Sequence, residues 1–315
     1  MPSLRSGALR CVGLVVLTLF AAATSAMTAR ADTTLRWKFK EGAKNHFEMT
    51  MEMVQDTKAG PMPFQVKMNQ IMDMTWEVKS VGDDGTATMN QTIDRVRMEM
   101  VLPQAGQPPI KYDSQQKEKA PGTEMLARIF EIMIGKPFVL RVTPLGKVLD
   151  LSAPADLVAA LKGASPQQMG GLFSEDGLKQ MISQSMMPLP EEDVAEGATW
   201  EKSAEMNTPP FGKQVTTTEY KFVGPEARDG RNLDKIDVAL DMKFEAGGDT
   251  QAKLKLKDNK ASGEIYWDND TGLPAESTVN SKMTFEITVE AQTIEQTVST
   301  KVRMKHVADA ATRDL

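Results

Sequence analysis

One stretch of the sequence, residues 64–102, limits most strongly what this chain can fold into. Side chains on a β-strand alternate between two faces. Apolar side chains recur with this period of two in the first half of the stretch, at Phe64, Val66, Met68, Met72, Met74, Trp76 and Val78. Gly82-Asp83-Asp84-Gly85 follows, and these residues tolerate the dihedral angles of a chain reversal. The pattern therefore predicts a long β-hairpin with one buried and one solvated face.

The returning half of this hairpin changes phase. Ala87, Met89 and Ile93 share one parity, whereas Val96, Met98, Met100 and Leu102 share the other. One extra residue in a strand shifts the alternation in this way, so we expect a β-bulge near Asp94-Arg95.

The N-terminus has the features of a secretory signal. Arg5 and Arg10 precede an apolar run at 12–23, which is too short to span a bilayer. Ala29-Arg30-Ala31 has the form of a signal-peptidase site, so cleavage is predicted after Ala31, with Ala26 as the alternative. Cys11 precedes the apolar run, which argues against a lipoprotein signal. We predict a periplasmic or extracellular protein whose mature chain has no transmembrane segment.

The composition excludes several classes of function. The formal net charge is −6, and the signal carries three arginines and no acid, so the mature chain is more acidic still. Spread acidic charge argues against nucleic-acid binding, which depends on clustered Lys and Arg. Cys11 is the only cysteine, so the mature chain has neither disulfides nor thiol chemistry, and its stability must come from a sizeable core.

The rest of the chain alternates in a similar way, which predicts a mainly β fold. We expect strands at Leu35–Phe39 and from Phe47, a loop at 58–63, a short strand around 110–112, and strands at 138–142 and 148–149. Further strands are expected after Trp200, with a turn at 224–230, a hairpin turn at 268–272 and a turn or bulge near Ala291-Gln292. The fold class expected is two long-stranded, curled antiparallel sheets with a few packed helices.

Three helices are expected between these groups of strands. Met125, Leu126, Ile129, Phe130 and Met133 lie on one face of a helix from Thr123 to Ile134, which Gly135 and Pro137 would end. Shorter helices are expected at 155–162 and 174–187. Pro188 and Pro190 then suggest a boundary, so the predicted division is a signal peptide (1–31), a β unit with a helical insert (32–187), a second β unit (188–308) and a disordered tail (309–315).

A short internal repeat suggests that the two β units are related. Glu41-Gly42-Ala43 recurs as Glu196-Gly197-Ala198, and Val81-Gly82 recurs before the later turn as Val223-Gly224. The order of the matches is preserved along the chain, which favours a tandem repeat.

The sequence has no recognisable catalytic motif. It contains neither a G-x-S-x-G elbow nor an H-E-x-x-H helix, and its two histidines, His46 and His306, lie far apart in the sequence. Asp268, Asp270 and Gly272 only partly match a calcium loop, and a hairpin turn accounts for them. We therefore predict a non-enzymatic protein without a cofactor.

Methionine is the most distinctive residue type: the chain has 22, twelve of them between Met49 and Met133. Thioethers suit Cu(I), so a copper(I)-binding protein is one hypothesis, with Met49, Met51 and Met53 as ligands. Methionine also fills cores and forms adaptable apolar sites. Because the expected helix must pack on the hairpin face, the predicted site for a lipid-like ligand comprises Met72, Met74, Trp76, Met125, Ile129 and Met133.

Two resemblances agree with this interpretation. Leu189-Pro190 followed by Val194, Gly197 and Trp200 resembles a segment of exported bacterial proteins known only as a domain of unknown function, and residues 35–42 and 112–114 fit that family. The resemblance implies an envelope location and carries no known activity. Residues 266–274 are similar to a hairpin of the periplasmic lipoprotein-carrier fold, a curled antiparallel sheet with helices in its concavity.

The sequence thus predicts an exported, non-enzymatic envelope protein that binds a lipid-like apolar molecule in a concave sheet. A structural scaffold that binds another envelope protein and a copper(I)-binding protein are the alternatives.

Overall fold

A computed structural model describes residues 32–60, 62–103, 108–116, 121, 123–164, 175–208, 212–246, 252–289 and 292–307. The expected signal peptide and the expected tail at 309–315 lie outside the described residues. The first part of the described chain forms β1 (Lys44–Ala59), β2 (Met62–Val81), β3 (Ala87–Val101), β4 (Ile110–Asp113), α1 (Glu124–Met133), β5 (Phe138–Val142), β6 (Val148–Ser152), α2 (Ala155–Ala164) and α3 (Glu175–Ser185). The second part forms β7 (Thr199–Thr208), β8 (Gly212–Arg228), β9 (Arg231–Ala246), β10 (Ala252–Asp268), β11 (Leu273–Val289) and β12 (Gln292–Val307).

The strands form one antiparallel sheet in the order β6-β5-β3-β2-β1-β12-β11-β10-β9-β8-β7, with β4 paired to β3. The mainly antiparallel β class with packed helices is therefore confirmed. The expected division into two sheets is not, because β1 pairs with β12 along its length, from His46 opposite Val307 to Ala59 opposite Ile294. The unit boundary between residues 187 and 188 stays a prediction.

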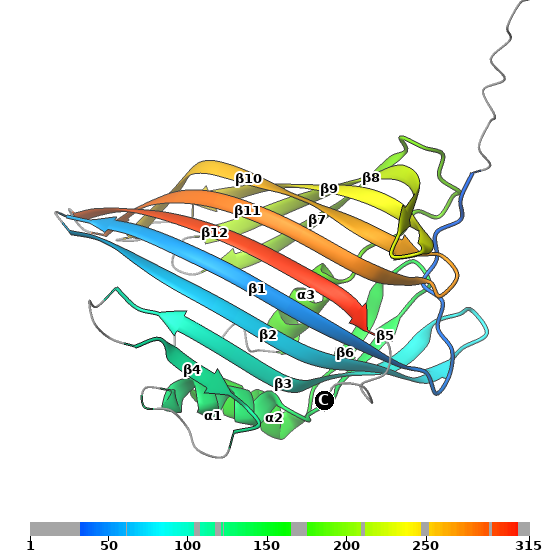
Figure 1. Ribbon diagram of the computed structural model, residues 1–315, viewed down its shortest axis with the longest axis horizontal. Coiled ribbons are helices and arrows are strands. Elements are labelled where there is room, and N and C mark those ends of the chain that lie inside the picture. Colours follow the sequence, from blue (N-terminus) through cyan, green and yellow to red (C-terminus); the bar gives the residue numbers. More distant parts are fainter. Residues whose placement is uncertain are drawn as a thin grey trace, which may run out of the picture. The chain divides into compact units, whose positions relative to one another are not determined.

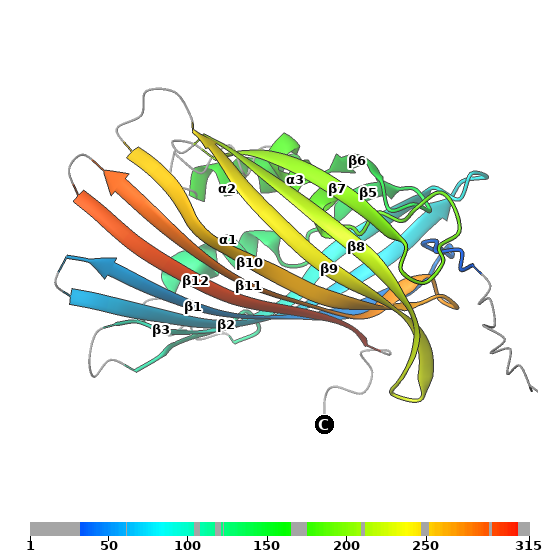
Figure 2. The same ribbon diagram turned by 90° about the horizontal axis from the view of Figure 1, so that it is seen from above.

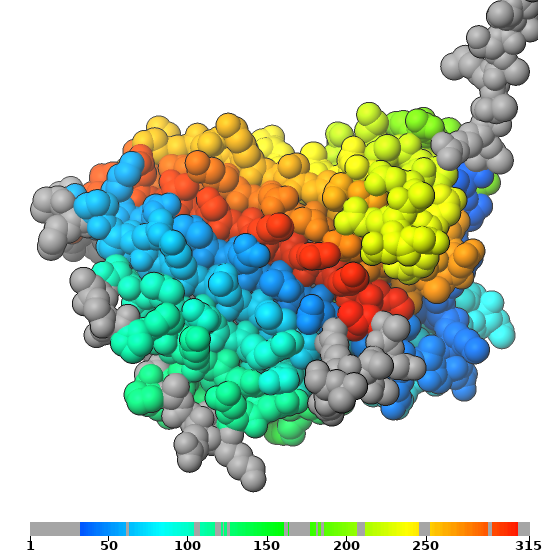
Figure 3. Space-filling view, in the orientation of Figure 1, coloured from blue at the N-terminus to red at the C-terminus, as the bar shows by residue number. Residues whose placement is uncertain are grey.

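The sheet is strongly curved, and the three helices lie in its concavity (Figures 1 and 2). We call the end where β1 begins and β2 ends the proximal end, and the opposite end the distal end. The convex side faces the reader in Figure 3, where the strands form one continuous surface and the β8–β9 hairpin, in yellow, overlies part of it. On that side Leu233, Tyr266 and Ala275 form a small buried cluster.

The main core fills the proximal part of the concavity. Trp37 contacts both Trp76 and Trp267 there, with ring centroids 6.2 Å apart for Trp37–Trp76 and 4.8 Å apart for Trp37–Trp267. Helices α2 and α3 contribute the buried Leu157, Leu178 and Ile182 to the same cluster. The segment 186–190 is tied to the proximal end by two indoles, since Trp37 Nε1 donates to the carbonyl of Met187 (3.1 Å) and Trp200 Nε1 donates to that of Pro188 (2.8 Å).

The central hairpin is as predicted. Its reversal spans Gly82–Thr86, where the Gly82 N–H donates to the Thr86 carbonyl (2.9 Å) and Gly85 has a φ of +76°. The bulge is also confirmed, because Asp73 lies opposite Arg95 and Met74 lies opposite Ile93, which leaves Asp94 without an opposing residue. Buried Met74, Trp76 and Val78 share one face, although Phe64 at the distal end of the same face is 38% exposed. The turn at 268–272 and the reversal between β11 and β12 are likewise confirmed.

Several local predictions were wrong. Residues 35–39 are not a strand: Leu35 and Trp37 are buried as expected, but the segment crosses the proximal end and donates only single backbone bonds, from Trp37 to Pro144 (2.9 Å) and from Lys38 to Gly272 (3.4 Å). The loop expected at 58–63 is shorter, since β1 extends to Ala59 and β2 begins at Met62.

The turn expected at 224–230 is also shorter, because β8 continues to Arg228. A bulge at Val223 preserves the pairing of β8 with β9, and Asp229-Gly230 alone reverses the chain. The helix expected at 155–162 extends to Ala164, and the one expected at 174–187 ends at Ser185, two residues earlier than predicted.

The short internal repeat has a structural counterpart. Gly42 donates to the carbonyl of Val78 (2.9 Å), and Val78 donates back to that of Ala43 (2.9 Å). In the second copy, Gly197 donates to the carbonyl of Phe222 (2.8 Å), and Phe222 donates back to that of Ala198 (2.9 Å). Both glycines have positive φ, +78° and +89°. Each copy of the motif therefore fastens a turn to the proximal end of a long strand.

In the part of the chain that the structure describes, no helix is both long enough and apolar enough to cross a membrane.

Candidate functional site

Charged side chains are sorted between the two faces of the sheet. Residues opposite each other on neighbouring strands share a face, so the registers assign every strand residue to one side. In the described parts of β1, β2 and β7–β12, the concave face carries no lysine, arginine, aspartate or glutamate except Lys202 and Asp234. Asp234 is 8% exposed and lies near the proximal end, opposite Trp267. The other charges of these strands lie on the outer face.

The distal part of the concave face is uncharged and only partly buried, and Gln55, Gln214 and Gln296 lie among its apolar side chains. Its partly buried apolar side chains are Met53, Met242, Phe244, Leu254, Leu256, Met283, Phe285, Ile287, Ile294 and Val298, which we call the distal trough. The Phe244 and Phe285 rings meet edge to face above β10, with centroids 6.0 Å apart. Among the described residues, none of the side chains of the distal trough belongs to a buried core cluster.

The residues that the sequence predicted as a ligand site lie mostly in the proximal core. Met74 and Trp76 are 8% and 4% exposed, and Ile129 and Met133 of α1 pack against the same cluster. Met72 packs instead against the smaller cluster around Val96 and Met98. The side chain of Met125 lies outside the described residues. The helix therefore packs on the hairpin face as expected, and the ligand-binding role of these residues stays a prediction.

Lys202 is the charged side chain nearest the distal trough. It lies on β7 opposite Thr218, which lies opposite Leu240 on β9. Its ammonium group donates to the carbonyl of Ser183 and to that of Met186 (2.9 Å), at the C-terminal end of α3. Burial lowers the pKa of Lys202. A cavity of about 90 Å³ beside it is lined by Lys202, Ala204, Thr216, Thr218 and Leu240.

Parity in the sequence could have identified Lys202. Trp200, Ala204 and Met206 have the parity of the buried face, and Lys202 lies between them as a charged residue on that face. The distal trough could not be separated from the core in the same way, because the alternation is the same in both and only the position of the helices distinguishes them.

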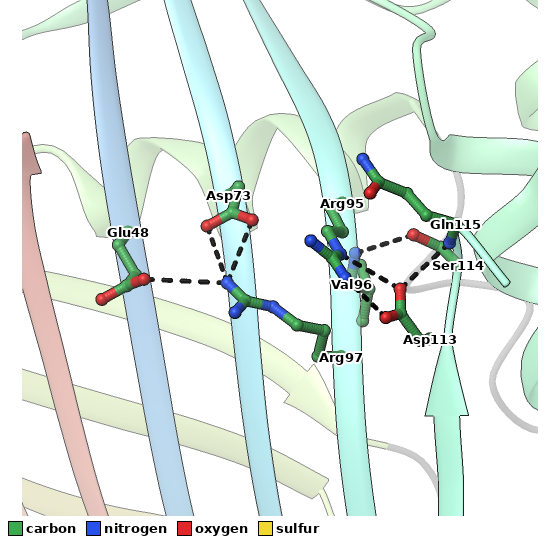
Figure 4. Close-up of polar contacts among 8 residues, drawn as sticks. All are labelled: Glu48, Asp73, Arg95, Val96, Arg97, Asp113, Ser114 and Gln115. Carbon is green, nitrogen blue, oxygen red and sulfur yellow. Dashed lines mark hydrogen bonds and ion pairs between the residues drawn. The ribbon is translucent and has the colours of Figure 1, made fainter. Parts of the chain in front are cut away.

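On the outer face, by contrast, charges are paired with one another (Figure 4). Arg97 donates to both carboxylate oxygens of Asp73 at 3.0 Å and lies 3.7 Å from Glu48. Arg95 binds Asp113 through two nitrogens, at 3.1 and 2.6 Å, and this hydrogen bonding lowers the pKa of the Asp113 carboxyl group. These contacts join β1, β2, β3 and the end of β4, so they have a structural explanation.

Two hollows of the described surface are lined in part by charged side chains. One of about 520 Å³ is bordered by Asp56, Lys58 and Lys282, and one of about 300 Å³ by Arg97, Glu99 and Lys111. Within the described ranges, no group of three or more His, Cys, Asp or Glu side chains could hold a metal ion.

The fold and this site define a curled antiparallel β protein with an uncharged, partly open concave face. The chain belongs to the family of unknown function DUF6263, whose model matches residues 84–293. The predicted resemblance to a domain of unknown function is thereby confirmed. No curated protein matches the sequence.

Among solved structures, the chain is similar to lipovitellin, from a study of its lipid–protein interactions, with 11% identity and a TM-score of 0.44 over 86% of this chain and 26% of that one. It therefore spans about a quarter of the lipovitellin chain. It is also similar to the hypothetical lipoprotein YmcC from Escherichia coli (10% identity, TM-score 0.22, 79% and 85% covered). The chain is also similar to a domain assigned to outer membrane lipoprotein sorting, from Vibrio parahaemolyticus. Here the identity is 9% and the TM-score 0.14, over 84% of this chain and 88% of that one. These likenesses concern the general arrangement only and carry no argument about function.

Proposed function

We propose that this protein is an exported, non-enzymatic binding protein of the cell envelope that holds a lipid-like apolar molecule in the distal trough. The observation that carries the proposal is the concave face, which beyond the described helices still carries many apolar side chains and, apart from Lys202, no charged ones. Large exposed apolar patches on a protein surface mark sites for ligands or partners. A concave apolar surface with few polar groups is the usual form of a small-molecule site.

The predicted site residues have a place in this proposal. Met74, Trp76, Ile129 and Met133 belong to or pack against the proximal core, and in this proposal they support the proximal end of the ligand site. Met53 and Met283 line the more open part. Methionine is unbranched and adaptable, so such a wall can accept apolar molecules of varied shape.

The test has two parts: extraction of any bound lipid, and measurement of dye binding after a charged residue is introduced into the distal trough. Organic extracts of gently purified protein should contain a lipid by mass spectrometry, and the delipidated protein should bind a neutral apolar dye. Met242→Lys should weaken dye binding at least tenfold, because an ammonium group on this face would have to be buried next to the dye without a partner. Ala239→Lys, on the exposed outer face of the same strand, is the matched control. Equal dye binding by the two variants would contradict the location of the site.

Export rests on the N-terminal signal features, and it can be tested separately. The protein recovered from the cell envelope should begin at Asp32, or at Met27 if Ala26 is the cleavage site. An intact Met1 on the mature protein would contradict export by this route.

Copper(I) binding is a second candidate, which one feature of the register favours. Met53 lies opposite Met68, and Met68 lies opposite Met100, so three thioethers lie side by side on adjacent strands. Thioether sulfur suits Cu(I). Replacing all three by leucine should abolish tight Cu(I) binding measured by competition with a cuprous chelator. The scaffold alternative would instead require a protein partner captured by cross-linking through the outer face.

A further inference from the structure

Among the described residues, dipoles alone balance the charge of Lys202. Its ammonium group is held by two main-chain carbonyls at the end of α3, where the helix dipole favours a cation. Among the described residues, no carboxylate forms an ion pair with it, whereas the surface lysines Lys58, Lys213 and Lys257 all have acidic partners. A lysine has three N–H donors, and the two carbonyls use two of them.

We infer that Lys202, together with Thr218, binds the carboxylate of a long-chain fatty acid whose hydrocarbon chain lies in the distal trough. This assignment rests on the proposed function and names its ligand. The cavity of about 90 Å³ is lined by Lys202, Thr216 and Thr218, so a carboxylate placed in it would lie beside one cation and two threonine side chains. A charge-assisted hydrogen bond to a carboxylate is about twice as strong as a neutral one.

The path from the cavity to the trough is continuous. Leu240 lines the cavity, and Met242 and Phe244 follow it on the same face of β9 towards the distal end. From Lys202 to the end of β7 at Thr208 the strand extends for roughly 20 Å, at about 3.3 Å per residue. One membrane acyl chain spans about 15 Å, half of a hydrocarbon core of about 30 Å. A single acyl chain therefore fits between the cavity and the distal end.

The balance of charge favours a carboxylate over a phosphate monoester. A phosphate monoester carries about −1.5 to −2 charges at pH 7. Lys202 provides one positive charge on a face that is otherwise uncharged in this region. A phosphate head group would therefore leave an unbalanced negative charge against apolar side chains, whereas a carboxylate would not.

The experiment compares two ligands that share one hydrocarbon chain, a charged carboxylate and its uncharged methyl ester. Oleate and methyl oleate are titrated into the delipidated protein by calorimetry at pH 8, with wild type, Lys202→Met and Lys221→Met. Lys221 is an exposed lysine on the outer face of β8, so its replacement is the matched control. Wild type and Lys221→Met should bind oleate at least tenfold more tightly than methyl oleate, and Lys202→Met should bind the two equally.

Different outcomes separate the two proposals. If both lipids bind wild type but Lys202→Met retains the preference for oleate, the head-group assignment is wrong and the apolar site stands. If neither lipid binds, the proposed function itself fails. Tighter binding of lysophosphatidic acid than of oleate would overturn the choice of a carboxylate.

Loss of the contacts to α3 could unfold Lys202→Met, and circular dichroism would show this. Lys202→Arg, which keeps the charge, then serves as the second variant and should retain the preference for oleate. In wild type, the carboxyl carbon of 13C-labelled oleate should titrate at a lower pH when bound than in a detergent micelle. An unchanged titration, or an arginine variant without the preference, would count against the assignment.

Discussion

Gly146 lies at a crowded point of the proximal end, and replacing it tests how that end is closed. Its φ is +76°, and a Cβ atom at this position would lie 2.2 Å from the Met187 carbonyl oxygen and 2.7 Å from the Trp37 indole nitrogen. These two groups form the hydrogen bond that ties segment 186–190 to the core. Gly146→Ala must therefore strain its own backbone and also displace that contact.

The expected cost has two parts, which a second glycine separates. A left-handed conformation costs a residue with a Cβ about 1–2 kcal/mol, and overpacking a rigid site costs about 1–3 kcal/mol more. Gly135 has a similar φ of +72°, but a Cβ there would have no neighbour within 4 Å. Gly135→Ala should therefore lose only the first part, whereas Gly146→Ala should lose about 2–5 kcal/mol in total.

Urea unfolding, followed by tryptophan fluorescence and by circular dichroism, would measure both variants. The free energy of unfolding should fall further for Gly146→Ala than for Gly135→Ala, by about 1–3 kcal/mol. Equal losses in the two variants would refute the reasoning, because they would mean that segment 186–190 is free to move away from Gly146.

Two further expectations concern pH. Burial alone would raise the pKa of Glu276, but a hydrogen bond from Arg303 (2.8 Å) and the charge of Arg228 hold it below its ordinary value. Stability should therefore fall as the pH drops below about 4.3, and Glu276→Gln should reduce this dependence in urea titrations. Burial lowers the pKa of His306, so stability should also fall as the pH drops below about 6.5, since only the unfolded chain binds the proton there. His306→Gln should flatten the change in the free energy of unfolding between pH 7 and 5.5. An unaltered slope in this variant would argue against the contribution of His306.

Much of the fold could be predicted from local patterns. Alternation identified the hairpin, the phase change identified the bulge at Asp94, and Gly and Asp residues identified the turns at 82–85 and 268–272. Each of these features depends on residues close together in the sequence. The prediction that Leu35 and Trp37 are buried was also correct, although their segment does not pair with a strand along its length.

What was missed depends on contacts between distant residues. The pattern of β1 shows which of its sides is buried but not which strand lies beside it, so its pairing with β12 could not be predicted. The same limit explains the error at 224–230, where the partner strand β9 keeps Gly224 and Pro225 in the sheet. For the site, the sequence identified the apolar face and the helix that packs on it, but not how far along the face the helices extend.

The extent of the uncharged face is the argument that separates a binding site from a core. A sheet face that only had to support α1, α2 and α3 would need apolar side chains at the proximal part alone, and water would tolerate lysine or glutamate beyond it, as on the outer face. Instead Met242, Phe244 and Ile287 continue the apolar alternation to the distal part, where they are only partly buried. Apolar surface of this kind is costly to leave in water, by roughly 25 cal/mol for each Å². An occupant that covers the distal trough removes this cost, and one cation beside an otherwise uncharged surface then selects an amphiphile with one negative charge.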